Sequence, residues 1–259
     1  MSGLENKIVL VTGGSGGIGQ ALAWEFTRQR CRVAIAARRQ ETLLACAEEI
    51  ARHGGEVLAI ACDVTDRQQV KDLGAAIGAR WGAVQILINN AGIARAASFT
   101  EMADELWDEI IATNLTGTYN CCKVFLPEML RAKWGRIINI GSTTAKVGYR
   151  HVTAYTASKH GLLGLTRSLA LETARQGVTV NMICPGYVDD ERTRENAQVL
   201  AQKAGKSVDE ILKLFASSAP QQRLIEADEV ASLAALIASE KLGGMTGQAI
   251  SVDGGATMV

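Results

Sequence analysis

Short runs of apolar, β-branched residues alternate along the chain with longer stretches in which apolar residues recur every three or four positions. The runs lie at residues 7–12 (KIVLVT), 32–37 (RVAIAA), 56–61, 84–89, 136–140, 178–183 and 248–252. Nearly continuous apolar strands between helices are typical of a parallel sheet covered on both faces. We therefore predict an α/β fold, a doubly wound parallel sheet with helices on both faces.

The intervening stretches predict the helices and the domain organisation. Helices are expected at residues 17–30, 41–53, 67–81, 153–175 and 227–239, with two more within 104–129. No linker rich in Pro, Gly or Ser divides the chain, so we expect a single domain over residues 1–259. Residues 186–220 are the least regular stretch, polar and charged, with an amphipathic piece at 208–215. We expect this stretch to be a substrate-loop or lid segment, since loops of this length are usually functional lids or contain helices of their own.

Charge and cysteine usage exclude several classes of protein. The 27 Lys and Arg residues balance the 27 Asp and Glu residues, which argues against binding to nucleic acid or to an anionic membrane surface. The six cysteines and three histidines are not clustered as metal ligands, so we expect buried thiols in a reducing compartment and no metal site. No apolar run approaches the ~20 residues that span a membrane, and no signal sequence opens the chain. We expect a cytoplasmic protein.

A glycine-rich segment at residues 12–19 (TGGSGGIG) follows the first predicted strand and opens the first predicted helix. Glycines there allow a sharp turn and let backbone N–H groups reach a pyrophosphate, which the helix dipole also favours. A tight turn without a ligand would use the same residues, but the strand–loop–helix context favours a Rossmann-type dinucleotide site. The expected cofactor contacts from this loop are Gly13, Ser15, Gly17, Ile18 and Gly19.

The end of the second predicted strand distinguishes between the two nicotinamide dinucleotides. A carboxylate there would bind the ribose 2′-OH of NAD, but the sequence has Ala37 followed by Arg38 and Arg39. A guanidinium suits a 2′-phosphate, so we predict NADP, held mainly by Arg38, with NAD as the alternative. The competing interpretation is that Arg38 is a solvated residue at the start of a helix.

Two further strand ends carry polar residues. Asp63 follows the third predicted strand, where its side chain is suited to the adenine amino group or, alternatively, to capping the next helix. Residues 89–92 (NNAG) end the fourth predicted strand, where such sheets bind ligands, although adjacent asparagines also form simple turns. We expect cofactor contacts from Asp63, Val64, Asn90, Ala91 and Gly92.

Ser142, Tyr155 and Lys159 form a candidate catalytic group. Tyr155 and Lys159 are four residues apart on one face of a predicted helix, and Ser142 ends the strand before it. A free tyrosine has a pKa near ~10, and a nearby charged lysine would lower that pKa. The serine hydroxyl is suited to holding a carbonyl oxygen. An ordinary helix surface would also carry such a pair, so the assignment depends on the other motifs.

The order and spacing of these motifs resemble the short-chain dehydrogenase/reductase family over nearly the whole chain. Residues 12–19 match its TGxxxGxG motif, 89–92 its NNAG, 155–159 its YxxxK, 185–186 its PG, and 246–255 its C-terminal signature. Ser142 precedes Tyr155 by the spacing that is usual in the family. The glycine motif alone is weak evidence, whereas all of these motifs in order are highly specific.

The resemblance implies roles that the residues alone do not. Asn114 becomes a fourth catalytic residue, which helps to hold a water that relays protons to Lys159. Lys159 would also bind the nicotinamide ribose next to Tyr155. The backbone around Pro185, Gly186 and Val188 would contact the nicotinamide.

The sequence departs from the family at one position of this segment. Relatives often carry a Thr that binds the nicotinamide carboxamide, and here the matching residue is Asp190. The usual contact is therefore in doubt, and Thr193 or the backbone would have to substitute for it.

These observations predict an NADP(H)-dependent oxidoreductase that transfers hydride between nicotinamide and a carbonyl or secondary alcohol. The chain most resembles reductases of 3-oxoacyl thioesters carried on acyl-carrier protein or coenzyme A. A secondary-alcohol, sugar or polyol dehydrogenase is the alternative. A dinucleotide-binding protein without catalysis is disfavoured because Tyr155 and Lys159 are both present.

The resemblance also bears on partners. It implies a homotetramer, built through the helices that contain Asn114 and Tyr155 and through the C-terminal strand region. Four basic residues of the expected lid are suited to the phosphates of a carrier such as coenzyme A, or else are simply solvated; they are Arg192, Arg194, Lys203 and Lys206.

Overall fold

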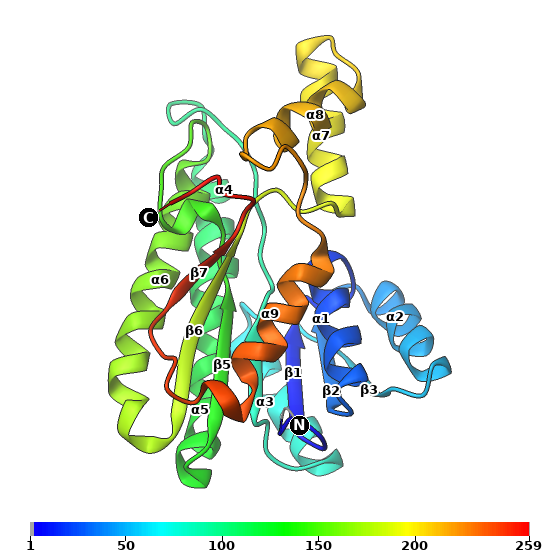
Figure 1. Cartoon of the computed structure of the whole chain (residues 1–259), viewed down its shortest axis with the longest axis vertical. Coiled ribbons are helices and arrows are strands. Elements are labelled where there is room, and N and C mark those ends of the chain that lie inside the picture. The colour runs from blue at the N-terminus through cyan, green and yellow to red at the C-terminus, as the bar shows by residue number, and fades with distance from the viewer. Residues whose placement is uncertain (1–2, 259) are drawn as a thin grey trace.

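Seven parallel strands form one sheet in the order β3-β2-β1-β4-β5-β6-β7 (Figure 1). The computed structural model describes residues 3–258. The strands are β1 (Ile8–Thr12), β2 (Arg32–Ala37), β3 (Glu56–Ala61), β4 (Ile86–Asn89), β5 (Gly135–Ile140), β6 (Val178–Pro185) and β7 (Ala249–Val252). In register, Val9 of β1 pairs with Val33 of β2 on one side and with Ile86 of β4 on the other. The predicted doubly wound parallel sheet is confirmed.

Helices cover both faces of the sheet. On one face α1 (Gly17–Arg28), α2 (Gln40–Arg52) and α9 (Ala227–Ala238) pack on the strands through Phe26, Ile50 and Val230. On the other face α3 (Arg67–Arg80), α5 (Gly117–Ala132) and α6 (Thr153–Thr173) contribute Leu73 and Phe125, among others. Burying the strands from both sides explains their nearly continuous apolar sequences.

Two regions differ from the helices expected from the sequence. The stretch within 104–129 is α4 (Asp104–Ile111) and α5 joined by a π-helical turn at Ala112–Thr116, which sequence periodicity does not reveal. Thr153–Thr173 ends earlier than expected and passes into a 3₁₀ turn at Ala174–Gln176. Further 3₁₀ turns lie at Thr143–Ala145 and Glu240–Leu242.

The stretch at 186–220 folds as a helical hairpin, α7 (Glu191–Ala204) and α8 (Val208–Ser217), which projects beyond the sheet at the top of Figure 1. The amphipathic piece expected at 208–215 is the core of α8, whereas α7 was not expected. α7 is polar and buries only Thr193, Ala197 and Ala201. Together with Ile211, the two alanines form an apolar cluster separate from those that cover the sheet.

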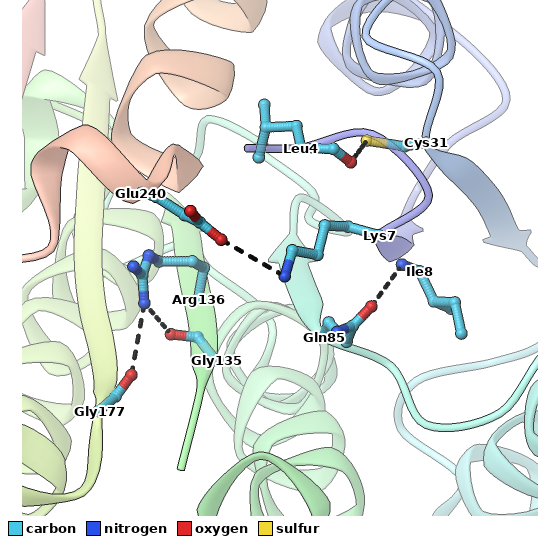
Figure 2. Close-up of polar contacts among 9 residues, drawn as sticks. All are labelled: Leu4, Lys7, Ile8, Cys31, Gln85, Gly135, Arg136, Gly177 and Glu240. Carbon is cyan, nitrogen blue, oxygen red and sulfur yellow. Dashed lines mark hydrogen bonds and ion pairs between the residues drawn. The ribbon is translucent and has the colours of Figure 1, made fainter. Parts of the chain in front are cut away.

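The amino-terminal ends of the strands are tied together by polar contacts (Figure 2). Lys7 Nζ lies 3.7 Å from a carboxylate oxygen of Glu240 and 3.9 Å from the centre of the Trp134 ring. Arg136, only 4% exposed, donates to the carbonyls of Gly135 and Gly177 at 2.8 and 3.4 Å. These contacts join the N-terminal segment, β5 and the 3₁₀ turn before β7, at the rim opposite the hairpin.

The structure also bears on membrane spans, metal sites and disulfides. No helix within residues 3–258 is long and apolar enough to cross a membrane. The same residues contain no group of His, Cys, Asp or Glu arranged to hold a metal ion. All six cysteines are buried as free thiols.

Candidate active site

The glycine-rich loop lies at the carboxyl end of β1, beside β4, where the strand order reverses direction. Gly13 has φ of +65° and Gly17 of +52°, left-handed conformations that favour glycine. A Cβ atom on Gly19 would stand 2.0 Å from the Gly13 carbonyl oxygen, and one on Gly14 would stand 2.8 Å from Ile35 Cβ. The loop is therefore packed too closely for side chains at these positions. Ligands of such sheets bind in this crevice.

The start of α1 presents unpaired backbone donors. Its N-cap is Gly16, which has no side chain to cap the helix, and no acidic residue lies in the first turn. The first N–H groups of a helix have no partner within the helix, and they and the helix dipole attract an anion. Ser15 and Ile18 lie beside these donors and are partly exposed. This geometry suits a diphosphate, as the sequence predicts.

Asn90 braces the glycine-rich loop. Its side-chain amide donates to the carbonyls of Thr12 and Gly13, both at 3.0 Å. Thr12 Oγ1 in turn accepts from the N–H groups of Asn90 and Ala91, both at 3.1 Å. The Asn90 side-chain amide nitrogen is thus a structural part of the loop. Ala91 and Gly92 line the same edge and are partly exposed.

Arg38 lies at the end of β2, next to the loop. The N–H of Gly13 donates to the Ala36 carbonyl at 2.7 Å, which places the loop beside the end of β2. The Arg38 side chain is exposed, and its guanidinium has no hydrogen-bond or ion-pair partner within residues 3–258. A free guanidinium beside a dinucleotide loop is well placed for a 2′-phosphate.

At the end of β3 the two alternatives for Asp63 separate. The N-cap of α3 is Asp66, whose carboxylate accepts from the N–H groups of Gln68 and Gln69. Asp63 is therefore not the cap; its Oδ1 accepts from the N–H and hydroxyl of Thr65 at 2.9 and 2.8 Å. Its neighbour Val64 is buried, and the Val64 carbonyl accepts from Asn120. Asp63 remains the candidate for adenine.

The structure brings Ser142, Tyr155 and Lys159 together, as the sequence predicts. Lys159 Nζ is buried, lies 5.6 Å from the centre of the Tyr155 ring, and donates to the Ile140 carbonyl at 2.7 Å. Ser142 begins the 3₁₀ turn after β5, with its hydroxyl accepting from Thr144 N–H at 3.2 Å. All three side chains meet at the carboxyl end of β5.

The electrostatics of this group differ from the expectation. Burial raises the pKa of the Tyr155 phenol, although a hydrogen bond from the Ser142 side chain and the charge of Arg192 oppose the rise. Burial and, to a lesser extent, the charge of Arg192 together lower the pKa of Lys159 to about 7. A lowered pKa of Tyr155 was expected from a charged lysine; here burial outweighs the surrounding charges. At neutral pH Tyr155 therefore retains its proton.

Asn114 is held in place by the π-helical turn that interrupts α4 and α5. Its side chain accepts from Ile93 N–H at 2.8 Å and donates to the Ile93 carbonyl at 2.9 Å and to Ser158 Oγ at 3.0 Å. Ser158 donates in turn to the Tyr155 carbonyl at 2.7 Å. π-Helical turns are frequent at functional sites. Asn114 thus connects the loop after β4 to the helix that carries Tyr155 and Lys159.

The segment after β6, residues 186–190, leads from the carboxyl end of the sheet to the start of α7. Pro185 ends β6, and a Cβ on Gly186 would meet Asp253 Cα at 3.1 Å. Val188 is buried and bridges to Ile225, so only its backbone can reach a cofactor. Asp190 caps α7, accepting from Thr193 N–H at 2.8 Å.

A small cavity lies between this segment and the α7–α8 hairpin. It is lined by Thr143, Tyr149, Tyr187, Phe215 and Arg223, among others. The rings of Tyr187 and Phe215 stack with centres 4.3 Å apart and planes 4° from parallel. This stack joins α8 to the segment after β6 and forms one wall of the cavity.

The four basic residues of the hairpin differ in their partners and in their distance from the catalytic group. Arg194 pairs with Asp189 at 2.7 Å. Arg192 is exposed, its guanidinium has no partner within residues 3–258, and its charge acts on both Tyr155 and Lys159. Lys203 and Lys206 lie on the exposed end of α7. Of the four, Arg192 is the one that faces the catalytic group.

Sequence reasoning missed the supporting residues of the site. Thr12 and Ser158 lie inside the motifs at residues 12–19 and 155–159, but the motifs do not reveal their supporting contacts with Asn90 and Asn114. The Tyr187–Phe215 stack carries no motif and joins segments far apart in the chain. Arg192 was singled out only as one of four basic residues. Its position two residues after the Asp190 cap is the signal that places it at the base of the hairpin.

Comparison with known proteins agrees with this geometry. The pattern of the family described as short chain dehydrogenase matches residues 7–201. A putative ketoacyl reductase of the granaticin polyketide synthase from Streptomyces violaceoruber is 40% identical over 253 residues, which cover 96% of this chain and 92% of that protein. The 3-oxoacyl-[acyl-carrier-protein] reductase FabG of Staphylococcus aureus (strain Mu50) is 35% identical over 97% of this chain and 98% of its own length.

A solved structure extends the similarity to the fold. The crystal structure of a variant of actinorhodin polyketide ketoreductase with NADPH superposes with a TM-score of 0.95 at 35% sequence identity, and the match covers 100% of both chains. The fold of this chain therefore matches that of a ketoreductase crystallised with NADPH over the full length of both chains.

Proposed function

The chain belongs to the short-chain dehydrogenase family and is an oxidoreductase acting on carbonyl or alcohol groups, and we propose that it reduces 3-oxoacyl thioesters with NADPH. The observation that carries the proposal is the buried Tyr155–Lys159 pair beside Ser142, at the crevice that holds the glycine-rich loop. Relatives named as ketoacyl reductases support the choice of substrate.

The residues present fit an NADP(H) molecule. The tightly packed glycines and the uncapped start of α1 suit the diphosphate. Arg38 suits the 2′-phosphate, Asp63 the adenine, and Lys159 the nicotinamide ribose. When bound, the cofactor supplies or accepts the hydride.

The chain's own residues handle the proton and the carbonyl oxygen. Because burial keeps Tyr155 protonated, its hydroxyl is a proton donor to the oxygen as the carbonyl is reduced. Ser142 holds the same oxygen by a hydrogen bond. Lys159, with a pKa of about 7, exchanges protons at neutral pH, and its Nζ lies 5.6 Å from the centre of the Tyr155 ring; we propose that it restores the proton of Tyr155. Asn114 fixes the backbone around this relay.

Arg192 and the α7–α8 hairpin support the choice of substrate. Arg192 supplies an unpaired positive charge near the catalytic group, which suits the phosphates of a carrier-bound thioester. We infer that the α7–α8 hairpin is a lid, because its apolar cluster is separate from those on the sheet and the Tyr187–Phe215 stack borders the cavity next to Thr143.

The test is the decay of nicotinamide absorbance with purified protein, acetoacetyl-CoA and either NADPH or NADH. Faster decay with NADPH is expected. Decay mainly with NADH would contradict the role of Arg38. Decay only with sugars, polyols or simple ketones would contradict the thioester substrate. No decay with any substrate, despite cofactor binding, would favour a non-catalytic binding protein.

We also infer a homotetramer from the family resemblance. The helices expected at its interfaces carry exposed apolar side chains: Trp107 on α4, Tyr119 on α5, and Leu171 on α6, the last 83% exposed. Sedimentation equilibrium should give four times the mass of the chain. The mass of a monomer would contradict this assembly.

A further inference from the structure

The carboxylate of Asp190 lies against the glycine-rich loop. A Cβ atom on Gly17 would stand only 2.7 Å from Asp190 Oδ2, so this oxygen occupies the space over the first residue of α1. Oδ1 accepts from Thr193 N–H at 2.8 Å and caps α7. Oδ2 has no hydrogen-bond donor within residues 3–258. One carboxylate therefore joins the start of α7 to the start of α1.

The same place is suited to an anion. α1 has a glycine N-cap and no acidic residue in its own first turn, so its first N–H groups and its dipole favour negative charge beside the loop. Asp190 is partly exposed there and reaches the loop from a segment far along the chain. A carboxylate and a diphosphate are both negatively charged, so they repel each other when they lie at the same helix N-terminus.

We propose that Asp190 and the diphosphate of the dinucleotide compete for the start of α1, so that cofactor binding displaces the Asp190 carboxylate and uncaps α7. The inference rests on the proposed function, since it requires a dinucleotide in the crevice. It makes Asp190 a residue that lowers cofactor affinity and couples the cofactor to the position of the hairpin. A Thr, which relatives often carry there, has no charge and does not compete.

The hairpin is attached in a way that permits such coupling. Its apolar cluster of Ala197, Ala201 and Ile211 is separate from the clusters on the sheet. Gln222, where the chain returns from α8, has φ of +53°, an uncommon conformation for a residue other than glycine. Losing the cap therefore loosens the first turn of α7 without disturbing the core.

The first test is the dissociation constant for NADPH, measured by fluorescence on the full chain. Asp190→Asn keeps a side chain that caps helices equally well and removes only the charge. We expect it to bind NADPH about fivefold more tightly or better, with the gap narrowing as salt rises. Asp189→Asn is the matched control, because it removes a neighbouring charge that pairs with Arg194 and not with the loop; its affinity should match the wild type.

The second test follows the cap itself by hydrogen exchange. NADPH should speed exchange at the Thr193 amide, which donates to Asp190, in the wild type but not in Asp190→Asn. Unchanged affinity in Asp190→Asn would overturn the proposal. Weaker binding would overturn it too, because Asp190 would then be a cofactor ligand. If no variant bound any dinucleotide, the proposed function itself would be contradicted, and this inference with it.

Discussion

At the amino-terminal ends of the strands, Lys7 and Arg136 both lie near the Trp134 ring, Lys7 pairs with Glu240, and Arg136 donates to two backbone carbonyls. At the carboxyl ends, Arg38 and Arg192 have no partner within residues 3–258, and α1 begins without a side-chain cap. The charged side chains at the amino-terminal ends bind other protein groups and stabilise the fold. The unpaired arginines and the uncapped start of α1 at the carboxyl ends are available to bind a ligand. The two rims should therefore respond differently to mutation, one in stability and the other in activity.

The largest effect of a mutation on activity is expected at Tyr155. Tyr155→Phe removes the proton donor and should lower kcat by roughly 10²- to 10⁴-fold, while NADPH affinity and Tm stay near those of the wild type. Stopped-flow or steady-state absorbance measures the rate. Tyr119→Phe is the matched control: it also removes one phenol hydroxyl but keeps the aromatic ring at the proposed tetramer interface, so it should keep full activity. Normal turnover by Tyr155→Phe would exclude it as the acid.

Arg38 tests the unpartnered charges of the same rim. Arg38→Glu should weaken NADPH binding about 10- to 100-fold, the loss of charge-assisted hydrogen bonds, and improve binding of NADH. Because the Arg38 side chain is exposed and unpaired, Tm should not change. Arg39→Glu, which alters the neighbouring exposed arginine, should shift the preference less. Equal effects of the two variants would show only a general loss of positive charge.

Lys159 offers a test with a defined pH dependence. Its pKa is about 7 in the folded chain against an ordinary 10.5, so between these values the unfolded chain binds more protons and stability rises with pH. Below the folded pKa both states are charged and the full cost of burying the charge remains. Lys159→Met should therefore gain more stability over the wild type at about pH 6 than at about pH 10.

The same variant should also change the kinetics. The rate of reduction should fall as pH rises through about 7 in the wild type, because Lys159 then has no proton to pass on. Lys159→Met should be slow and lose this inflection. Lys123→Met, an exposed residue of α5, controls for loss of a lysine and should show neither effect. Retention of the inflection would assign it to another group.

The smallest effect is expected at the opposite rim. Arg136→Ala should lower the free energy of unfolding by about 1–3 kcal/mol, because two backbone carbonyls lose their buried donor, and should leave kcat unchanged. Urea unfolding measures the first quantity. Arg131→Ala, whose ion pair with Glu128 is exposed, should change stability by less than about 0.5 kcal/mol. A loss of activity in Arg136→Ala would contradict the expectation that mutations at the amino-terminal ends of the strands affect stability alone.

The sheet and the grouping of Ser142, Tyr155 and Lys159 could be predicted from the sequence because both depend on local signals. Apolar strands, the glycines of residues 12–19 and the spacing of Tyr155 and Lys159 are all readable within one segment. The direction of the Tyr155 pKa shift was predicted wrongly, since burial is a property of the packed chain.

Other features were inaccessible for a related reason. The contact of Asp190 with Gly17 joins segments far apart in the chain, and no residue pattern marks it. The π-helical turn at Ala112–Thr116 is stabilised by tertiary packing rather than by composition. α7 escaped prediction because it buries only a narrow stripe of small residues, although Asp190 and Gly205 mark its two ends.

The reaction that we propose transfers hydride to a carbonyl carbon while Tyr155 supplies the proton. The most direct measurement uses NADPH carrying deuterium at the transferred position, with acetoacetyl-CoA, and mass spectrometry of the product. We predict deuterium on the former carbonyl carbon of the 3-hydroxyacyl product with the wild type, and almost none with Tyr155→Phe over the same time. Product without deuterium, or equal labelling by both proteins, would contradict the account.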